Sequence, residues 1–354
     1  MFVGWMSHEA YVAGLLVSAP TDTIAPTFKM PATSALMTPH TQSSETPATI
    51  LAFGDMMLDR SIRLAIYANG PAHPFEKVEP LLTGNDIVVA NAEGPFTRNK
   101  SVTAGVHNGP LTFTFDPATL PTLKQLGFTV FSQANNHSLN FGSAGLRQSE
   151  RSIEAAGMQW FGDPSNIDGH DFATTTHGQT IAFVGYNQFD AEDDATLAAD
   201  QARIESAIRA EKQTGAFVIV YPHWGVEYAA RATAGQTAAA HAFIDAGADL
   251  ILGSHPHVIE PLEIYKGKLI FYSLGNFIFD QYQTGPTAQG LAVRISLAST
   301  SVSYQLVPLD IYHGQASVMD NMHRSALLNT LADESNLPYP QGWEVRGGEV
   351  VVDR

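Results

Sequence analysis

Two histidines separated by one proline, His255 and His257, end the apolar run DLILGSHPH (residues 249–257). An apolar run of this kind predicts a buried strand. The packing of a core gives no reason for two imidazoles at the end of such a strand. Because imidazole binds metals and transfers protons, the pattern predicts that His255 and His257 face a functional site.

Several other apolar runs also end in a residue that binds a metal or transfers a proton. These residues are Asp55, Glu93, Asn136 with His137, and His223. In open α/β sheets, ligand sites lie beyond the carboxyl ends of the strands, so these groups are expected to lie together. Taken singly, each has a structural explanation, such as capping a turn or forming a hydrogen bond at the end of a strand. Their joint occurrence, in order, favours a metal site.

The candidate ligands combine imidazole nitrogen with carboxylate and amide oxygen. This set suits Zn, Mn or Fe and is too rich in nitrogen for Ca or Mg. Two divalent ions in such a set would leave a local excess of positive charge, which attracts an anionic substrate. They would also lower the pKa of a bound water toward about 7 and supply hydroxide as a nucleophile.

The composition restricts the partners and the chemistry. Lys and Arg total 19 and Asp and Glu total 35 in the 354 residues, which gives a formal net charge of -16. Because no run of Lys or Arg is present to neutralise phosphates, nucleic acid is not expected as a partner. The chain has no cysteine, which excludes disulfides, thiolate nucleophiles and cysteine-ligated zinc.

The elements that must position these residues alternate between strands and helices, which predicts an α/β fold. Apolar runs predict strands over 49–55, 86–94, 128–137, 180–187, 216–225 and 249–257. Helical spacing predicts helices over 117–127, 143–157, 194–215 and 237–247. A closing hairpin over 290–312 and a helix over 322–335 are expected near the end of the chain.

The first 48 residues differ in composition from the rest. YVAGLLVSAP (11–20) is typical of the apolar region of a signal peptide with VSA as its cleavage site, although no Lys or Arg precedes it. A wrongly assigned start codon is the rival explanation. Residues 20–48 are rich in Pro, Thr, Ser and Ala, which predicts a disordered linker. This arrangement favours an extracytoplasmic or membrane-associated location over a cytoplasmic one.

Five separated blocks of the sequence match a known family in the same order. They are FGDMMLDR (53–60), NAEGP (91–95), ANNHSLNFGSAGL (134–146), YPHWGVEY (221–228) and GADLILGSHPHVIEPLEIYKGKLIFYSLGNFIFDQ (247–281). Together they resemble the bacterial CapA family of capsule or poly-γ-glutamate synthesis proteins, a branch of the calcineurin-like metallophosphoesterases. The resemblance implies a four-layer αββα sandwich. It divides the chain into an N-terminal segment (1–48), a CapA-like domain (49–282) and C-terminal strands and a helix (283–354) that complete the same domain.

The resemblance also implies roles for the residues at the strand ends. It implies metal ligands at Asp55, Glu93, Asn136, His223, His255 and His257, which hold one or two divalent ions. Asn91 is a less favoured alternative to Glu93 as the ligand that bridges two ions. His137 is implied to act on the substrate as an acid or as an electrostatic stabiliser.

Three positions depart from the pattern of the family or its superfamily. Met57 stands where the superfamily has a second metal-binding histidine, as the CapA branch allows, so one metal site is a ligand short. Asn140 stands where Asp is expected, which removes a carboxylate that could orient His137. Glu260 stands where Gln is common.

Four residues near these positions have alternative interpretations. Arg60 grips a phosphate or carboxylate of the substrate, or pairs with a surface acid. Trp224 and Tyr228 flank His223 and form either a pocket wall or part of the core. Asn276 is a candidate to brace the histidine loop through hydrogen bonds.

The sequence therefore predicts a metal-dependent hydrolase of capsule or poly-γ-glutamate biosynthesis, which breaks a phosphoester or an amide bond with a metal-bound hydroxide. The expected partners are an anionic polymer or phosphoester substrate and a capsule-synthesis complex at the membrane. The alternative hypothesis is a non-catalytic assembly or export partner of a polymer-synthesis complex, which Met57 and Asn140 favour. Metal content discriminates between the two hypotheses.

Overall fold

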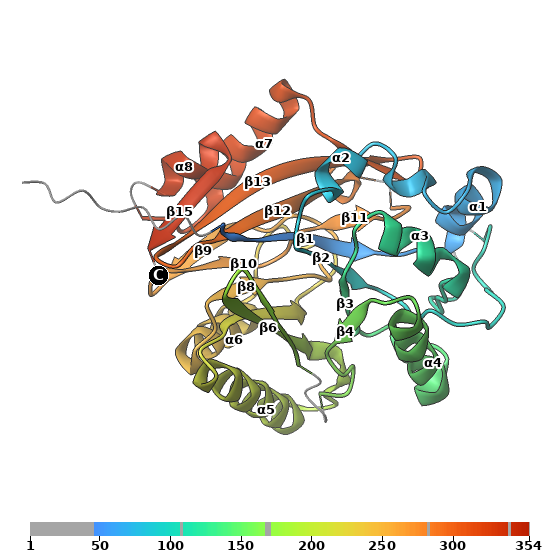
Figure 1. Ribbon diagram of the computed structural model, residues 1–354, viewed down its shortest axis with the longest axis horizontal. Coiled ribbons are helices and arrows are strands. Elements are labelled where there is room, and N and C mark those ends of the chain that lie inside the picture. The colour runs from blue at the N-terminus through green and yellow to red at the C-terminus, as the bar shows by residue number, and fades with distance from the viewer. Residues whose placement is uncertain (1–45, 107–108, 167–170, 282–283, 339–340, 354) are drawn as a thin grey trace, which may run out of the picture. The chain divides into compact units, whose positions relative to one another are not determined.

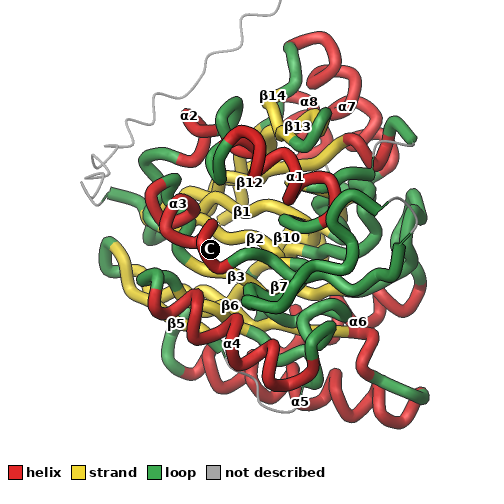
Figure 2. Tube along the Cα trace, turned by 90° about the vertical axis from the view of Figure 1, so that its right-hand side faces the viewer, coloured by secondary structure: helices red, strands yellow, loops and turns green. Residues whose placement is uncertain are grey.

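The computed structural model describes residues 46–106, 109–166, 171–281, 284–338 and 341–353. In this part of the chain, two β-sheets lie face to face and helices cover their outer faces (Figure 1). The view turned by 90° shows the strands of both sheets stacked between helices (Figure 2). The structure thus confirms the four-layer αββα sandwich.

The first sheet has the strand order β14-β13-β12-β1-β2-β3-β4, with β11 beside β1 and β15 beside β13. Strands β1 to β4 run parallel to one another, whereas β12 is antiparallel to both β1 and β13. The bounds are β1 (Ala48–Met56), β2 (Ile87–Ala92), β3 (Val130–Ser132), β4 (Gln159–Phe161), β11 (Asn276–Ile278), β12 (Gln289–Leu297), β13 (Ser301–Tyr312), β14 (Gln315–Val318) and β15 (Glu349–Asp353).

The second sheet has the strand order β5-β6-β7-β8-β10-β9. Its inner strands β6, β7, β8 and β10 are parallel, and the edge strands β5 and β9 are antiparallel to their neighbours. The bounds are β5 (Phe172–Thr176), β6 (Gln179–Asn187), β7 (Phe217–His223), β8 (Leu250–Leu252), β9 (Leu262–Tyr265) and β10 (Lys268–Phe271).

The helices belong to three groups. The outer face of the first sheet packs on α1 (Arg60–Asn69), α2 (Glu79–Leu82), α3 (Leu120–Gln125) and α4 (Gly142–Ala155). The outer face of the second packs on α5 (Asp194–Gln213) and α6 (Ala234–Ala246). Apolar residues of α7 (Asn321–Glu334) and α8 (Gln341–Gly347) join the core between the sheets. Single 3-10 turns occur at His73–Phe75, Pro117–Thr119, Gln188–Asp190 and Pro286–Ala288.

Strand β1 contributes to two apolar layers at once. Leu51 and Phe53 belong to the core on the helix side of the sheet, whereas Ile50 and Ala52 belong to the core between the sheets. Successive side chains of a strand point to opposite faces, so a strand between two apolar layers is apolar throughout. This explains why β1 appears in the sequence as a continuous apolar run.

The two sheets approach each other closely near the carboxyl ends of their strands. A Cβ atom added at Gly185 in β6 would lie 2.6 Å from the Cα atom of Gly162, which follows β4. The hydroxyl of Tyr221 in β7 donates a hydrogen bond to the backbone carbonyl of Phe53 in β1. Groups that follow the strands of one sheet can therefore meet groups that follow the strands of the other.

The structure has an element in each range predicted from periodicity, although β3 and β8 are shorter than expected. No helix within the described ranges is long and apolar enough to cross a membrane. The apolar segment at 11–20 and most of the expected linker at 20–48 lie outside the described residues. Ala48, the last residue of that linker range, begins β1 and pairs with Leu297 of β12.

Candidate metal centre

The residues predicted at the strand ends come together at one edge of the two sheets. The first sheet contributes Asp55 in β1, Glu93 after β2, and Asn136 with His137 after β3. The second sheet contributes His223 at the end of β7, and His255 and His257 after β8. The cluster therefore forms where the carboxyl ends of both sets of parallel strands meet.

Asp55, Glu93 and His257 form a first, buried group. One donor atom from each lies within 4.8 Å of the others. Nδ1 of His257 is 3.4 Å from Oδ2 of Asp55, and Nε2 of the same ring is 3.6 Å from Oε1 of Glu93. Oε2 of Glu93 is buried without a hydrogen-bond partner. A buried carboxylate oxygen without a partner carries a large desolvation cost, which a bound cation would remove.

Asn136, His223 and His255 form a second group. Nε2 of His223 lies 3.0 Å from Oδ1 of Asn136 and 3.1 Å from Nδ1 of His255. The two imidazoles are buried, whereas Asn136 is exposed. Atoms bound to one ion at about 2.0–2.2 Å lie roughly 3 Å from one another. The two contacts of His223 therefore have the separation that ligands of a single ion require.

Hydrogen bonds connect the two groups, and one of them joins Asn91 to the ligand candidate Asp55. The backbone N–H of His255 donates to Oδ2 of Asp55 at 2.9 Å, and the amide of Asn91 donates to Oδ1 of Asp55 at 2.7 Å. The amide oxygen of Asn91 accepts a hydrogen bond from Asn135 at 3.0 Å. Because these bonds occupy Asn91, the arrangement favours Glu93 over Asn91 as a ligand.

Burial and neighbouring charges set the protonation of the histidines. Burial lowers the pKa of His255 to about 3 and the pKa of His223 well below its usual value, so both rings are neutral at neutral pH. Burial also opposes a charge on His257, but the carboxylates of Glu93 and Asp55 outweigh it and raise its pKa to about 9. Burial raises the pKa of Glu93 well above its usual range, so its carboxyl group takes up a proton unless positive charge, from His257 or from a bound cation, lies beside it.

His255 and His257 have backbone angles that few residues other than glycine adopt. The angle φ is 96° at His255 and 59° at His257. Such conformations cost on the order of 1–3 kcal/mol each and persist only where the surroundings hold them. Nδ1 of His257 lies 3.0 Å from Oδ1 of Asn276, and Asp55 accepts the backbone N–H of His255. Asn276 thus contacts the histidine loop in the way expected of a bracing residue.

Met57 does not take part in this centre. Its side chain is buried in the core between the first sheet and its helices, and its sulfur accepts the backbone N–H of Asp59 at 3.1 Å. The ligand that the superfamily has at this position is therefore not replaced by Met57. The remaining nitrogen and oxygen donors still fit a divalent metal of the Mn, Zn or Fe type.

His137 lies beside the first group. Its Nε2 is 3.8 Å from Oε1 of Glu93. Its Nδ1 is 3.2 Å from Oδ1 of Asn140, which also accepts the backbone N–H of Phe113 at 2.6 Å. Asn140 thus makes the orienting contact expected of an Asp, without the charge. Burial lowers the pKa of His137 to about 4, so the ring is neutral at neutral pH.

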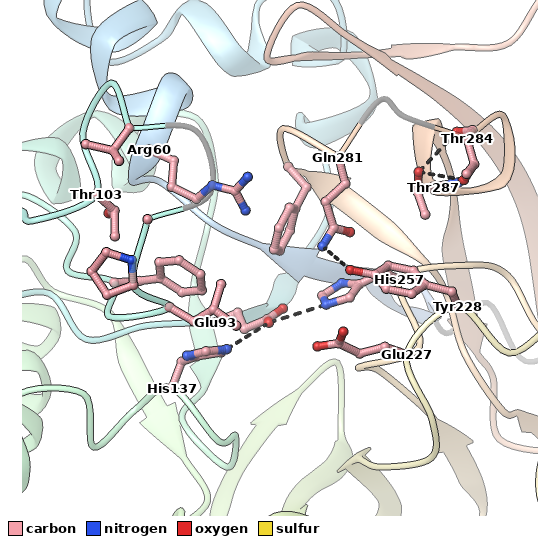
Figure 3. A pocket seen from close by; sticks show the side chains of 16 residues that line it. Arg60, Glu93, Thr103, His137, Glu227, Tyr228, His257, Gln281, Thr284 and Thr287 are labelled. Carbon is pink, nitrogen blue, oxygen red and sulfur yellow. Dashed lines mark hydrogen bonds and ion pairs between the residues drawn. The ribbon is translucent and has the colours of Figure 1, made fainter.

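A cavity of about 430 Å³ opens beside Glu93, His137 and His257 (Figure 3). Arg60 also lines this cavity, and its guanidinium points into it. Nε of Arg60 pairs with Oδ1 of Asp280 at 3.2 Å. The two interpretations of Arg60 are therefore compatible, because the side chain pairs with an acid and still faces the cavity.

Some residues that line the cavity are not among those predicted from the sequence. Glu227 and Gln281 line it, and Gln281 donates a hydrogen bond to the hydroxyl of Tyr228 at 3.1 Å. Of the two aromatic residues near His223, Tyr228 lines the cavity, whereas Trp224 belongs to the core beneath α5 and α6. The available signal for Glu227 was its place in the block YPHWGVEY.

The two sheets between helices, with a buried Asp, Glu and His group beyond their strand ends, define an α/β sandwich with a candidate metal centre. The chain belongs to the family described as bacterial capsule synthesis protein PGA_cap, whose sequence model matches residues 49–281. This match confirms the resemblance seen in the five blocks of sequence.

The chain matches similar proteins over most of its length. The PGA biosynthesis protein CapA of Bacillus subtilis (strain 168) is 29% identical over 313 residues, which are 85% of this chain and 80% of that protein. The capsule biosynthesis protein CapA of Bacillus anthracis is 30% identical over 321 residues, 87% of this chain and 77% of that protein. Among solved structures, a phosphatase from Mycoplasma pneumoniae aligns with a TM-score of 0.43 and 15% identity, over 78% of this chain and 92% of that chain.

Proposed function

We propose that this protein is a metal-dependent hydrolase of capsule or poly-γ-glutamate biosynthesis, acting on a phosphoester or an amide bond. The observation that carries the proposal is the buried carboxylate of Glu93. Its Oε2 has no hydrogen-bond partner, and Asp55 and His257 lie beside it. A cavity large enough for a small substrate or a chain end opens at the same place.

Each group of residues has a defined part in this proposal. Asp55, Glu93 and His257 would hold one divalent ion, and Asn136, His223 and His255 a second. When bound, such ions activate water for attack on the substrate. The candidate metals are Mn, Zn and Fe, because the donors are imidazole nitrogen and carboxylate or amide oxygen.

His137 and Arg60 act on the substrate in this proposal. Asn140 and the ring of Phe113, whose centroid is 4.5 Å from that of His137, fix the imidazole beside the cavity. Because Nδ1 of the neutral ring donates to Asn140, Nε2 must first take up a proton; the imidazolium then stabilises or protonates the oxygen or nitrogen that leaves the substrate. Arg60 holds an anionic group of the substrate through its terminal N–H groups.

The experiment that tests the proposal compares two alanine variants. His255→Ala removes a ligand, so the purified protein is expected to lose metal and the stability that metal binding contributes. His137→Ala is expected to keep its metal and melting temperature but to lose about 10²–10⁴-fold in turnover, because a positioned acid contributes this much. Elemental analysis, thermal melts and assays on phosphoester and γ-glutamyl substrates measure these effects.

His313→Ala is the matched control, because His313 is exposed in the turn between β13 and β14. It is expected to match the wild type in metal content, melting temperature and turnover. If His137→Ala lost metal as severely as His255→Ala, the division of roles between ligand and acid would be wrong.

The position of Met57 favours a second candidate function. Because Met57 packs in the core, one ion site is a ligand short, which suits a non-catalytic assembly or export partner with at most one structural ion. Two metals per chain would support the hydrolase. A purified protein that binds no added Mn²⁺, Zn²⁺ or Fe²⁺ and turns over no substrate would support the non-catalytic partner.

We also propose an anionic polymer as the substrate, a capsule-synthesis complex at the membrane as a partner, and an extracytoplasmic or membrane-associated location. The names of the relatives, which refer to PGA and capsule biosynthesis, support these assignments. Fractionation of cells into cytoplasm, membrane and exported material tests the location, and recovery only in the cytoplasm would contradict it.

A further inference from the structure

The cavity beside the candidate metal centre carries opposite charges on two sides. In Figure 3, Arg60 and Glu227 lie on opposite sides of the cavity, and Glu93 and His257 lie between them in this view. Among the described lysine and arginine residues, Arg60 is the one that lines the cavity. A ligand that spans the centre therefore meets a guanidinium at one end and a carboxylate at the other.

The guanidinium of Arg60 is held in place. Arg60 begins α1 with φ of 54°, a conformation that is uncommon outside glycine. Its Nε pairs with Asp280 at 3.2 Å, and Asp280 also accepts the backbone N–H of Ser61 at 3.2 Å and its hydroxyl at 2.8 Å. The terminal nitrogens face the cavity (Figure 3). This geometry suits bidentate recognition of a carboxylate.

The carboxylate of Glu227 is exposed, and no ion pair joins it to another residue in the described ranges. Its loop is nevertheless fixed to the histidine loop, because the backbone N–H of Tyr228 donates to the carbonyl of Pro256 at 2.8 Å. The hydroxyl of Tyr228 accepts a hydrogen bond from Gln281. Glu227 therefore presents a negative charge from an anchored loop, without a cationic partner among the described residues, and it favours a cation on the ligand.

We propose that Arg60 and Glu227 select the amino-terminal end of a γ-glutamyl chain, an inference that rests on the proposed function. The first residue of such a chain carries a free ammonium group on the acyl side of the first γ-amide bond. The second residue carries a carboxylate on the amine side of that bond. With the ammonium at Glu227 and this carboxylate at Arg60, the amide lies between them, near Glu93 and His257.

The charges explain why an internal bond binds less well. An internal residue has an amide in place of the ammonium, so its α-carboxylate leaves it with a net negative charge that Glu227 repels. Hydrolysis of the first bond adds water across it: the C–N bond breaks, a C–O bond forms, and both protons of the water end on the nitrogen, which leaves a carboxylate and an ammonium group. The products are one glutamate and a chain shorter by one residue, with a new free ammonium group.

The test measures binding to the metal-free protein by calorimetry. The probes are tri-γ-glutamate with a free amino terminus and the same peptide with an acetylated amino terminus. The wild type is expected to bind the free peptide about fivefold more tightly, a modest preference because Glu227 is exposed. Glu227→Gln is expected to reduce the preference to less than about twofold. Glu79→Gln, which removes an exposed charge on α2 away from the cavity lining, should keep it.

A second pair of measurements tests whether Arg60 binds the carboxylate of the second glutamyl residue. Arg60→Lys keeps the charge but loses the planar fork, so it should weaken binding of the free peptide about tenfold. It should weaken binding much less when that carboxylate is converted to an amide. Arg98→Lys, at an exposed position outside the described cavity lining, is the control.

The results separate this inference from the proposed function. Equal binding of the free and acetylated peptides by the wild type, or an unchanged preference in Glu227→Gln, would overturn the inference. Cleavage of the first γ-amide bond at equal rates in both peptides by the Mn²⁺-loaded wild type would also overturn it and leave the hydrolase proposal intact. The free peptide would release glutamate, and the acetylated peptide would release N-acetylglutamate. If neither peptide were cleaved while the binding preference held, the selection of chain ends would stand and the hydrolase proposal would fail for amides.

Discussion

Glu260 follows the loop that carries His255 and His257, and its carboxylate is buried. One oxygen accepts a hydrogen bond from Gln236 at 2.9 Å, and the other has no partner. Burial raises the pKa of Glu260 to about 7. Between the unfolded pKa and pH 7 the folded state retains a proton that the unfolded state releases, so stability falls as pH rises through this range.

Glu260→Gln removes this dependence and is expected to stabilise the protein above pH 7. Gln has a similar shape and no charge to desolvate. We expect a gain of about 1–3 kcal/mol at pH 8, or a few degrees in melting temperature, and no gain near pH 4.5. Thermal melts at both pH values measure it, with Glu79→Gln as the exposed control. A gain of equal size at both values would contradict the assignment to ionisation.

At the same scale, the sequence predicted the residues of the candidate site better than those of its cavity. His255 and Asp55 stand out because a polar group ends an apolar run. Glu227 and Asp280 give no such signal, because an acid in a loop is usually solvated. Only the folded chain shows that Glu227 lines the cavity and that Asp280 pairs with Arg60.

Among the elements, β1 depends on close contact between two backbones. A Cβ atom added at Gly54 would lie 1.9 Å from the carbonyl oxygen of Gly275, and the backbone N–H of Asp55 donates to that oxygen at 3.1 Å. The strand predicted over 49–55 includes Gly54, which has no side chain to pack. The structure shows that Gly54 lies within β1 and is needed because β11 approaches it.

Gly54→Ala is therefore expected to destabilise the fold by about 3 kcal/mol or more. The added methyl group would clash with the backbone carbonyl of Gly275, which cannot rotate away. Gly235→Ala provides the matched control. Gly235 lies in α6, and its added Cβ would meet only the hydroxyl of Thr233 at 3.7 Å. That change should be neutral or stabilise slightly, since Ala has the higher helix propensity. Chemical denaturation measures both, and similar values would contradict the argument.

Short elements were the hardest to predict. Strand β4 (Gln159–Phe161) and strand β11 (Asn276–Ile278) have three residues each, too few for a period to appear. Helix α1 was missed because its buried apolar residues, Ile62 and Ile66, are few and its first residue has an unusual φ. Strand β3 is shorter than the apolar run that contains it, because the chain leaves the sheet after Ser132 to form the loop with Asn136.

On the scale of the whole molecule, the order of layers could be predicted, but the pairing of strands could not. Alternating strands and helices predicted α/β architecture, and the resemblance implied two sheets. The position of β12 between β1 and β13 depends on contacts between distant segments. Local periodicity carries no information on such contacts.

The described ranges predict where the chain can be shortened. A chain that begins at Thr46 keeps all of β1 and is expected to melt within about 2 °C of the full chain. A chain that begins at Ile50 loses Thr49, whose backbone N–H and hydroxyl donate to Asp86 at 2.8 and 2.7 Å, and Ala48, which pairs with β12. It should melt several degrees lower. Equal melting temperatures for both shortened chains would show that the start of β1 contributes little.

The pairing of β1 with β12 also has a consequence for synthesis on the ribosome. Strand β1 is among the first parts of the described fold to emerge, and β12 among the last. Until β12 arrives, one side of β1 is an open sheet edge with unpaired backbone groups, which can pair with other chains. Contacts this distant in sequence also slow folding. A nascent chain of this protein therefore depends on protection from aggregation until translation is nearly complete. A prematurely terminated chain keeps the unpaired edge of β1, which can pair with other chains.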